Sequence, residues 1–191
     1  MKRFILTIAI ACIAFYGMSQ ENLLSFSAGY AFANVDDSEY ITDDPDLKGT
    51  GWRINGTYDF NANEGPMAYG FSVGYISVSA SYTNSADTTI DYTIGTMPFY
   101  FAPKYLFGNE TIRGFVKLAI GGQSSNFTRT APGGKIVAND FGFYGGGGAG
   151  LMVNVHEMIF LSAEYEIAYM SNNYYRNGLM QSVMAGIGVR F

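Results

Sequence analysis

The sequence predicts an all-β protein: a closed, eight-stranded, antiparallel up-and-down transmembrane β-barrel. Large apolar residues alternate with small or polar ones in about eight segments, as they do in strands with two different faces. The connections between these segments alternate between long and short, which is typical of outer-membrane barrels. The 191 residues include 24 Gly, 15 Tyr and 15 Phe, and only 14% are charged. This composition is unusual for a helical protein and favours strands.

The first nineteen residues are expected to be a signal peptide. Lys2 and Arg3 precede an apolar segment at 4–16, and small residues then lead to a cleavage site before Gln20. The predicted domains are therefore a signal peptide at 1–19 and an outer-membrane β-barrel at 20–191. Cys12 is the one cysteine and lies in the apolar segment. Acylation of Cys12 in a lipoprotein is the alternative; otherwise the mature chain has no thiol for a disulfide or a metal site.

The first two strands are expected at 23–34 and 51–60. In both, large apolar residues occupy one face, and Trp52 is among them. A polar, acidic loop at 35–48 separates the two strands, and a short turn at 61–66 follows the second.

The third strand is expected from residue 69 to 78. Its apolar residues shift by one position after Tyr75, which predicts a β-bulge there. A second long polar loop at 79–91 leads to the fourth strand, 92–107, in which two prolines each remove a donor from the ladder. The outward residues of that strand are expected to be Met97, Phe99, Phe101 and Tyr105.

The second half of the chain repeats this pattern. Between residues 142 and 150, glycine occupies nearly every position on one face of the strand. These glycines leave room for neighbouring side chains inside a barrel. The strands are expected at 112–121, 141–153, 159–169 and 181–191, with a tight turn at 108–111, a third long loop at 124–139, a short turn at 154–157 and a last connection at 170–178.

The polar face of these strands predicts an interior charge network. A soluble, lipocalin-like barrel would hold its large apolar residues inside, whereas here charges of both signs lie among Gly, Ser and Ala. Such charges can pair within a narrow lumen. Lys117 is expected to meet Glu164, and also Glu166, across a strand that glycines at 146 and 148 leave bare. The predicted network comprises Arg53, Asp59, Lys104, Arg113, Lys117, Glu164, Glu166 and Arg190.

The aromatic residues predict two interfacial girdles and an orientation. They gather towards both ends of the strands, as at the two membrane surfaces. Short turns and both termini are expected on the periplasmic side, with long loops outside. The loop-end girdle is expected to contain Trp52, Phe141, Phe143, Tyr165 and Tyr169, and the turn-end girdle Tyr58, Phe60, Tyr105 and Phe191.

We predict no catalytic, cofactor-binding or metal-binding residues. His156, the one histidine, lies in a turn at the end opposite the outer leaflet. The acidic residues at 36–46 do not have calcium-loop spacing, and no helix follows the glycines at 145–148 to bind a phosphate. A formal net charge of -5 and a pI near 4.7 argue against a nucleic-acid partner.

The chain resembles the outer-membrane β-barrel family of Gram-negative bacteria, the small OmpA/OmpX-like, porin-family barrels, particularly those of Bacteroidetes type. The resemblance rests on the signal peptide, the segments 96–99 and 104–107, the glycines at 145–150 and the closing strand ending in Phe191. It implies an integral outer-membrane protein that contacts lipid and lipopolysaccharide. It also implies that Phe191 is the signal by which the barrel assembly machinery recognises the chain.

Three classes of function follow from this sequence. The first is a non-catalytic barrel that supports the envelope or presents surface loops, with a lumen filled by side chains and no large pore. The second is a component of a secretion or uptake assembly. The third is a lipid-modifying barrel enzyme, which the position of His156 disfavours. Fold alone does not choose among these classes.

Overall fold

The computed structural model describes residues 20–36, 47–62, 65–83 and 87–191. The expected signal peptide and the acidic residues 37–46 lie outside this part of the chain. Among the described residues there is no helix long and apolar enough to cross a membrane.

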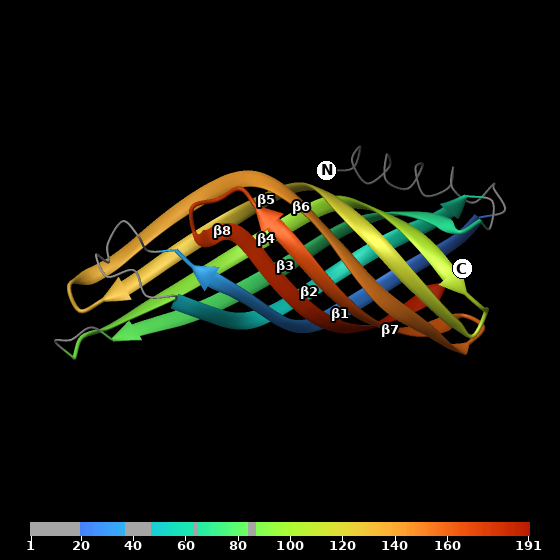
Figure 1. Cartoon of the computed structure of the whole chain (residues 1–191), viewed down its shortest axis with the longest axis horizontal. Coiled ribbons are helices and arrows are strands. Elements are labelled where there is room, and N and C mark those ends of the chain that lie inside the picture. Colours follow the sequence, from blue (N-terminus) through green and yellow to red (C-terminus); the bar gives the residue numbers. More distant parts are fainter. Residues whose placement is uncertain (1–19, 37–46, 63–64, 84–86) are drawn as a thin grey trace, which may run out of the picture.

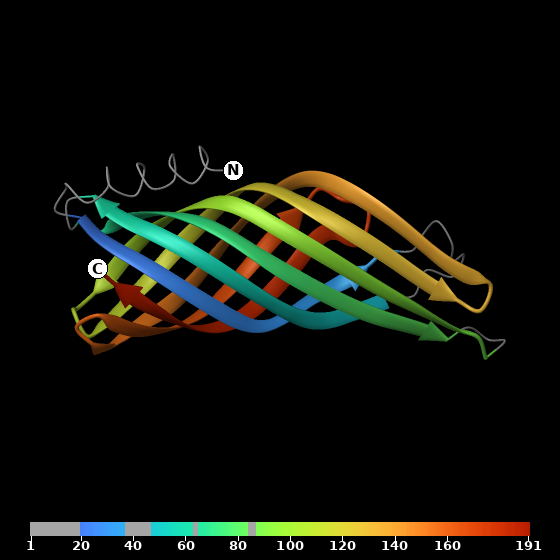
Figure 2. The same cartoon turned by 180° about the vertical axis from the view of Figure 1, so that it is seen from behind.

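The described residues form a closed barrel of eight antiparallel strands, as the sequence predicts (Figures 1 and 2). Each strand pairs with the next, and the last pairs with the first. The strands are β1 (Gln20–Val35), β2 (Leu47–Ala62), β3 (Met67–Thr83), β4 (Thr89–Gly108), β5 (Ile112–Ala131), β6 (Gly134–His156), β7 (Ile159–Met170) and β8 (Tyr175–Arg190).

The seam between β1 and β8 closes the barrel. Leu23 lies opposite Arg190, and the two strands stay in register up to Ala33 and Met180. At the turn end, Asn22 and Phe191 exchange two backbone hydrogen bonds of 3.0 Å each. The start of β1 and the C-terminus therefore lie at the same end of the barrel (Figure 1).

Large apolar side chains cover the outside of the barrel. Phe26 is 62% and Tyr30 71% exposed, whereas their neighbours on β1 point inward or are small. On β4, Met97, Phe99, Phe101 and Tyr105 all point outward, which confirms the predicted phase of that strand. Exposure of so continuous an apolar surface to water would be unfavourable, so this band of outward apolar residues is the part of the barrel that faces lipid.

Towards the loop end, the apolar side chains of the strands change from the outer to the inner face of the barrel. Strand β3 shows this change most clearly. Its outward residues change from aromatic to Ser77, Ser79 and Ser81, while Ile76 and Val78 point inward and are fully buried. The predicted bulge near Tyr75 is wrong, since β2 and β3 pair one to one throughout this region. Beyond the lipid the outside meets water, so the apolar residues move to the inside.

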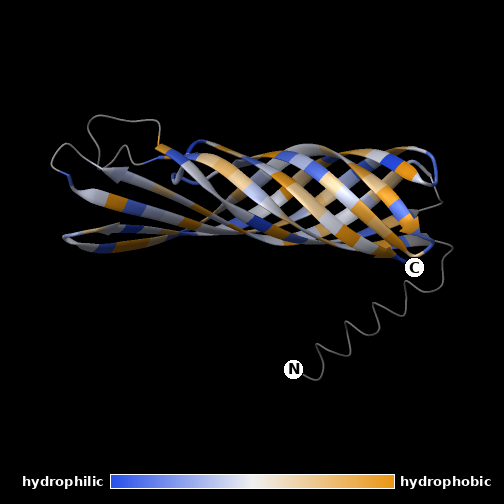
Figure 3. Ribbon diagram, turned by 90° about the horizontal axis from the view of Figure 1, so that it is seen from below, coloured by the Kyte–Doolittle hydropathy of each residue, from blue (hydrophilic) through white to orange (hydrophobic). Residues whose placement is uncertain are grey.

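The barrel therefore continues outward as an extension with a core of its own. Its buried residues include Leu47, Ile90, Tyr92, Phe127 and Tyr175. Along the ribbon, hydrophobic residues are concentrated in the half that carries the C-terminus, and the extension contains fewer of them (Figure 3). At the loop end the interior is thus lined by large apolar residues, in addition to the small and charged residues expected from the sequence.

The third long loop predicted at 124–139 is instead a β-hairpin. β5 and β6 remain paired to Ala131 and Gly134, where a two-residue turn of Pro132 and Gly133 joins them. β7 begins to pair with β6 only at Tyr144. As a result, the edge of β6 between Gly134 and Gly142 has no paired strand on its β7 side among the described residues (Figure 1), whereas the backbone of Phe143 is hydrogen-bonded to Ser171.

Candidate functional site

The centre of the barrel is occupied by an ion-pair cluster around Arg53 and Glu166. Both residues are fully buried, and the Arg53 guanidinium donates to a carboxylate oxygen of Glu166 at 2.6 Å. Arg53 also donates to the hydroxyls of Ser182 and Tyr100 at 3.0 Å each. The guanidinium thus joins side chains from four strands, β2, β4, β7 and β8.

Lys117 completes this central cluster from β5. Its ammonium lies 2.5 Å from a Glu166 oxygen and also forms an ion pair with Glu164. Gly148 of β6 stands in register between Lys117 and Glu166, and Gly150 stands in register with Glu164. The structure therefore brings Lys117 to both glutamates across a glycine-lined strand, although the intervening glycines are 148 and 150 rather than 146 and 148.

Two buried tyrosines support the cluster. The Tyr144 hydroxyl donates to Glu166, and its ring stacks on that of Tyr100 with a centroid distance of 4.9 Å. The Lys117 ammonium lies 5.6 Å from the centroid of the Tyr100 ring, within cation–π range. Buried charges with this many partners hold their strands in one arrangement, because moving a strand would separate a buried charge from the groups that compensate it.

A second ion pair lies nearer the turn end. Lys104 donates to Asp59 at 2.6 Å, and its ammonium lies 5.5 Å from the centroid of the Phe115 ring. Arg113 and Arg190 are half-buried at the turn end, where Arg190 donates to Asn154 at 3.2 Å. The eight charged residues of the predicted network thus form three groups. Four lie in the central cluster, Lys104 and Asp59 form the pair nearer the turn end, and Arg113 and Arg190 lie at the turn end itself.

A layer of neutral polar side chains closes the lumen on the loop side. Thr96 and Ser125 share a hydrogen bond of 2.8 Å, the hydroxyls of Thr96 and Tyr175 lie 3.2 Å apart, and Asn172 donates to Ser125 at 3.1 Å. Gln123 accepts a hydrogen bond from Ser125 and is fully buried. Buried apolar side chains lie beyond this polar layer, towards the loop end.

Sequence reasoning missed the partners of Arg53. Tyr100 and Ser182 have the inward parity of their strands, so their direction was readable from the alternation. Their contact with Arg53 depends on which side chains the closed barrel brings to the same depth. Alternation predicts the face on which a residue lies, but not this depth.

Residue types that bind metals do not form a cluster in the described part of the chain. No group of three or more His, Cys, Asp or Glu is placed there to hold a metal ion. His156 lies exposed at the end of β6 and accepts a 3.3 Å hydrogen bond from the backbone of Met158 in the following turn. Six of the interior charged residues form ion pairs with each other: Arg53, Asp59, Lys104, Lys117, Glu164 and Glu166.

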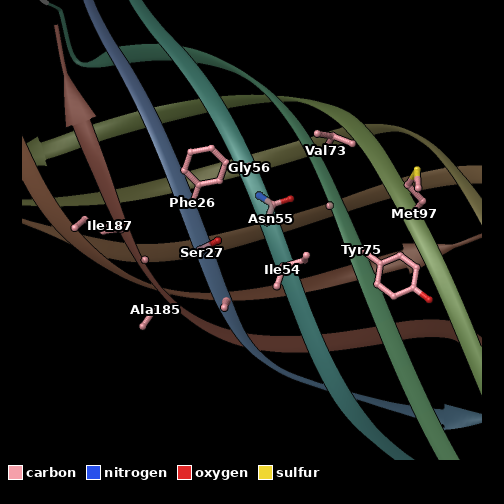
Figure 4. A pocket seen from close by; sticks show the side chains of 13 residues that line it. Phe26, Ser27, Ile54, Asn55, Gly56, Val73, Tyr75, Met97, Ala185 and Ile187 are labelled. Atoms are coloured by element: carbon pink, nitrogen blue, oxygen red, sulfur yellow. The ribbon is translucent and has the colours of Figure 1, made fainter.

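One groove lies on the outer surface of the barrel. It has a volume of about 810 Å³ and crosses β8, β1, β2 and β3, with Phe26, Ile54, Val73 and Tyr75 around small residues such as Gly56 (Figure 4). The groove belongs to the lipid-facing band, and most of its lining is apolar. It therefore gives acyl chains an uneven surface to pack against.

The family model of the outer membrane protein beta-barrel domain matches residues 5–191. Neisserial surface protein A is 16% identical, with 88% of this chain and 97% of that chain covered and a TM-score of 0.56. Ail, the attachment invasion locus protein of Yersinia pestis, is 20% identical (coverage 89% and 99%, TM-score 0.53). OprG of Pseudomonas aeruginosa is 10% identical (coverage 89% and 96%, TM-score 0.53).

At such identities these likenesses show the fold alone. No curated protein matches the chain. The family match covers nearly the whole sequence and agrees with the closed barrel, its lipid-facing band and its paired interior charges. The chain belongs to the outer membrane protein beta-barrel domain family and is a protein of the bacterial outer membrane.

Proposed function

We propose that this protein is a non-catalytic outer-membrane barrel that closes its own lumen and presents β-hairpins outside the cell. The observation that carries the proposal is the combination of a filled interior with strands that continue past the lipid band. Arg53, Glu166 and Lys117 fill the centre, while β5 and β6 extend to the turn at Pro132. Such a barrel anchors an ordered external surface and passes no solute.

The proposed orientation places both termini and the short turns in the periplasm. The turns after β4 and β6 are short, whereas the β5–β6 hairpin is long and has a polar tip. Outer-membrane barrels keep their short turns on the periplasmic side. The hairpin then lies outside the cell.

A component of a membrane assembly is the second candidate. The open edge of β6 between Gly134 and Gly142 favours it, because an unpaired strand edge readily accepts a strand from a partner. In that case the hairpin would serve association rather than display.

Affinity capture from native outer membranes separates the two candidates. The variant to compare with the intact protein replaces residues 126–139 by Asn-Gly, which joins the paired residues Ser125 and Asp140 through a two-residue turn. A presenting barrel should be recovered without stoichiometric envelope partners in both forms. Envelope proteins that accompany the intact chain in fixed ratio, and are lost with the trimmed hairpin, would support the assembly and contradict the first candidate.

A further inference from the structure

The open edge of β6 presents backbone groups in a defined order. Where β7 ends, the backbone N–H of Ser171 donates to the carbonyl oxygen of Phe143 at 3.0 Å, and the backbone N–H of Phe143 donates to the Ser171 hydroxyl at 2.7 Å. In an antiparallel ladder, the backbone groups of every second residue point to the same side of the strand. Four further residues therefore turn their N–H and C=O groups to the side on which the described residues place no strand: Lys135, Val137, Asn139 and Phe141.

The side chains along this edge are apolar on both faces of the sheet. Val137 and Phe141 point outward and are 53% and 69% exposed, whereas Ile136 points inward and is 41% exposed. Ala138 also points inward and packs against the buried core of the extension. An added strand would cover side chains on both faces and would enlarge that core.

The charged residues of the edge lie near its two ends. Lys135 is exposed beside the turn of the hairpin. Near the other end, the Asp140 carboxylate accepts a hydrogen bond of 2.8 Å from the backbone N–H of Phe141. The donors left for a partner are thus the N–H groups of Lys135, Val137 and Asn139. Because opposite charges on facing strands attract, the cation at the outer end favours an acidic residue in the partner.

The edge also gives the added strand a direction. β7 runs antiparallel to β6 and ends at Met170. An antiparallel partner, which pairs slightly better per residue than a parallel one, would continue the line of β7 away from the lipid band. Its first residue would lie opposite Phe141, near the membrane surface, and its seventh opposite Lys135.

A second copy of the barrel does not fit this edge. Two copies in one membrane are related by a twofold axis along the membrane normal. Since barrel strands tilt by roughly 35 to 45° from that normal, the two β6 edges would cross at about 80°. Neighbouring strands of a sheet differ by only roughly 20 to 25°. The added strand must therefore come from a different protein.

We propose that β6 pairs with an extended segment of another cell-surface protein. The segment runs outward and antiparallel to β6, with β-branched residues opposite Phe141 and Val137 and an acidic residue opposite Lys135. Its backbone accepts the three free donors of the edge. The partner's place outside the cell rests on the proposed orientation, and the existence of a partner rests on the second candidate function.

A synthetic strand tests this pairing. The probe is the peptide Val-Lys-Thr-Val-Ile-Val-Glu, whose residues would lie in turn opposite those from Phe141 back to Lys135, with a fluorophore on a soluble N-terminal linker. Its binding to the mature chain in phosphatidylcholine nanodiscs is measured by fluorescence anisotropy, and empty nanodiscs give the background. We expect saturable binding to the intact chain and none to the chain in which Asn-Gly replaces residues 126–139.

Methylation of the peptide backbone separates strand pairing from general hydrophobicity. The third and fifth residues of the peptide would turn their N–H groups towards β6, whereas the fourth and sixth would turn theirs away. N-methylation of the third and fifth residues should weaken binding about tenfold, because two hydrogen bonds are lost. N-methylation of the fourth and sixth residues adds the same two methyl groups and should leave the affinity nearly unchanged.

Val137→Pro is the corresponding change in the protein. It removes one N–H from the open side and leaves the hydrogen bonds between β6 and β5 in place, since the backbone groups of Val137 point away from β5. It should weaken binding about fivefold, whereas Val137→Thr keeps the donor and should change little. Heat-modifiable migration shows that each variant is folded.

A charge exchange tests the direction of the added strand. Lys135→Glu should weaken binding about threefold, as expected for an exposed ion pair. A peptide that ends in Lys instead of Glu should recover the affinity for that variant. No recovery would contradict the antiparallel direction.

The contrary outcomes for the pairing itself are equally definite. Absence of saturable binding, equal weakening by the two methylation patterns, or equal affinity of the Val137→Pro and Val137→Thr variants would overturn strand addition. Affinity capture can fail separately. An envelope protein recovered in fixed ratio without donor-dependent peptide binding would support the assembly and contradict this edge as its site, whereas donor-dependent binding without a captured protein would support the edge and contradict the assembly.

Discussion

At the scale of single residues, substitution of Lys117 will test whether the interior charges stabilise the barrel. It pairs with Glu164 and Glu166, but Glu166 is also held by Arg53. Lys117→Met therefore leaves Glu164 as the unpaired charge. We expect a loss of about 3 kcal/mol in the free energy of unfolding, measured by urea titration in detergent micelles.

Replacing Glu164 together with Lys117 should recover most of that loss, because no buried charge is then left alone. A coupling energy near zero in the Lys117→Met, Glu164→Leu cycle would contradict the pairing. Gly148→Leu should cost a comparable amount, since a Cβ at this position would lie 2.8 Å from the carbonyl oxygen of Tyr165 and 3.3 Å from Cε of Lys117. Lys135→Met on the exposed hairpin is the control and should change little.

Phe191 is the second residue to test. Its backbone closes the β1–β8 seam through Asn22, and its ring lies 6.5 Å from that of Tyr58. Its ring is 53% exposed, so an assembly factor could reach it. Deleting Phe191 should leave the chain unfolded in the periplasm or degraded, as judged by fractionation and heat-modifiable migration. A truncated chain that reaches the outer membrane at normal levels would show that Phe191 is not the assembly signal.

At the scale of elements, the β5–β6 hairpin fixes the orientation to be tested. Gly133 is at its tip with no atom near its missing side chain, and Glu110 is exposed in the turn at the opposite end. Cys12 is expected to be removed with the signal peptide, so Gly133→Cys and Glu110→Cys each give the mature chain a single thiol. An impermeant maleimide on intact cells should label only the first. Labelling of Glu110→Cys alone would invert the topology.

At the scale of the whole molecule, closure of the lumen predicts the absence of a channel. Phe115, Tyr144 and Met184 are buried in the interior together with the paired charges. An eight-stranded barrel has an interior that side chains can fill. The reconstituted protein should show no steady conductance in planar bilayers, with a general porin as the positive control. A stable, large conductance would mean that the interior opens in the membrane.

Particular positions show how much of the fold could be predicted from the sequence. Alternation placed Phe26, Trp52 and Met97 on the outside because neighbouring side chains of a strand must point to opposite faces. It failed at Ile76 and Val78, where the same strand leaves lipid for water and the apolar face changes sides without any change of register. A one-residue shift in hydrophobicity looks the same for a bulge and for a change of solvent.

The sequence by itself determined the strand count, the lipid-facing residues and the presence of charges inside, since these follow from local alternation and turn chemistry. Only the tertiary structure decided that Arg53 meets Glu166 and Tyr100, and that residues 124–139 continue as a hairpin. The contacts of Arg53 join strands distant in the chain. Their geometry depends on the register and stagger with which the barrel closes, and no local pattern specifies either.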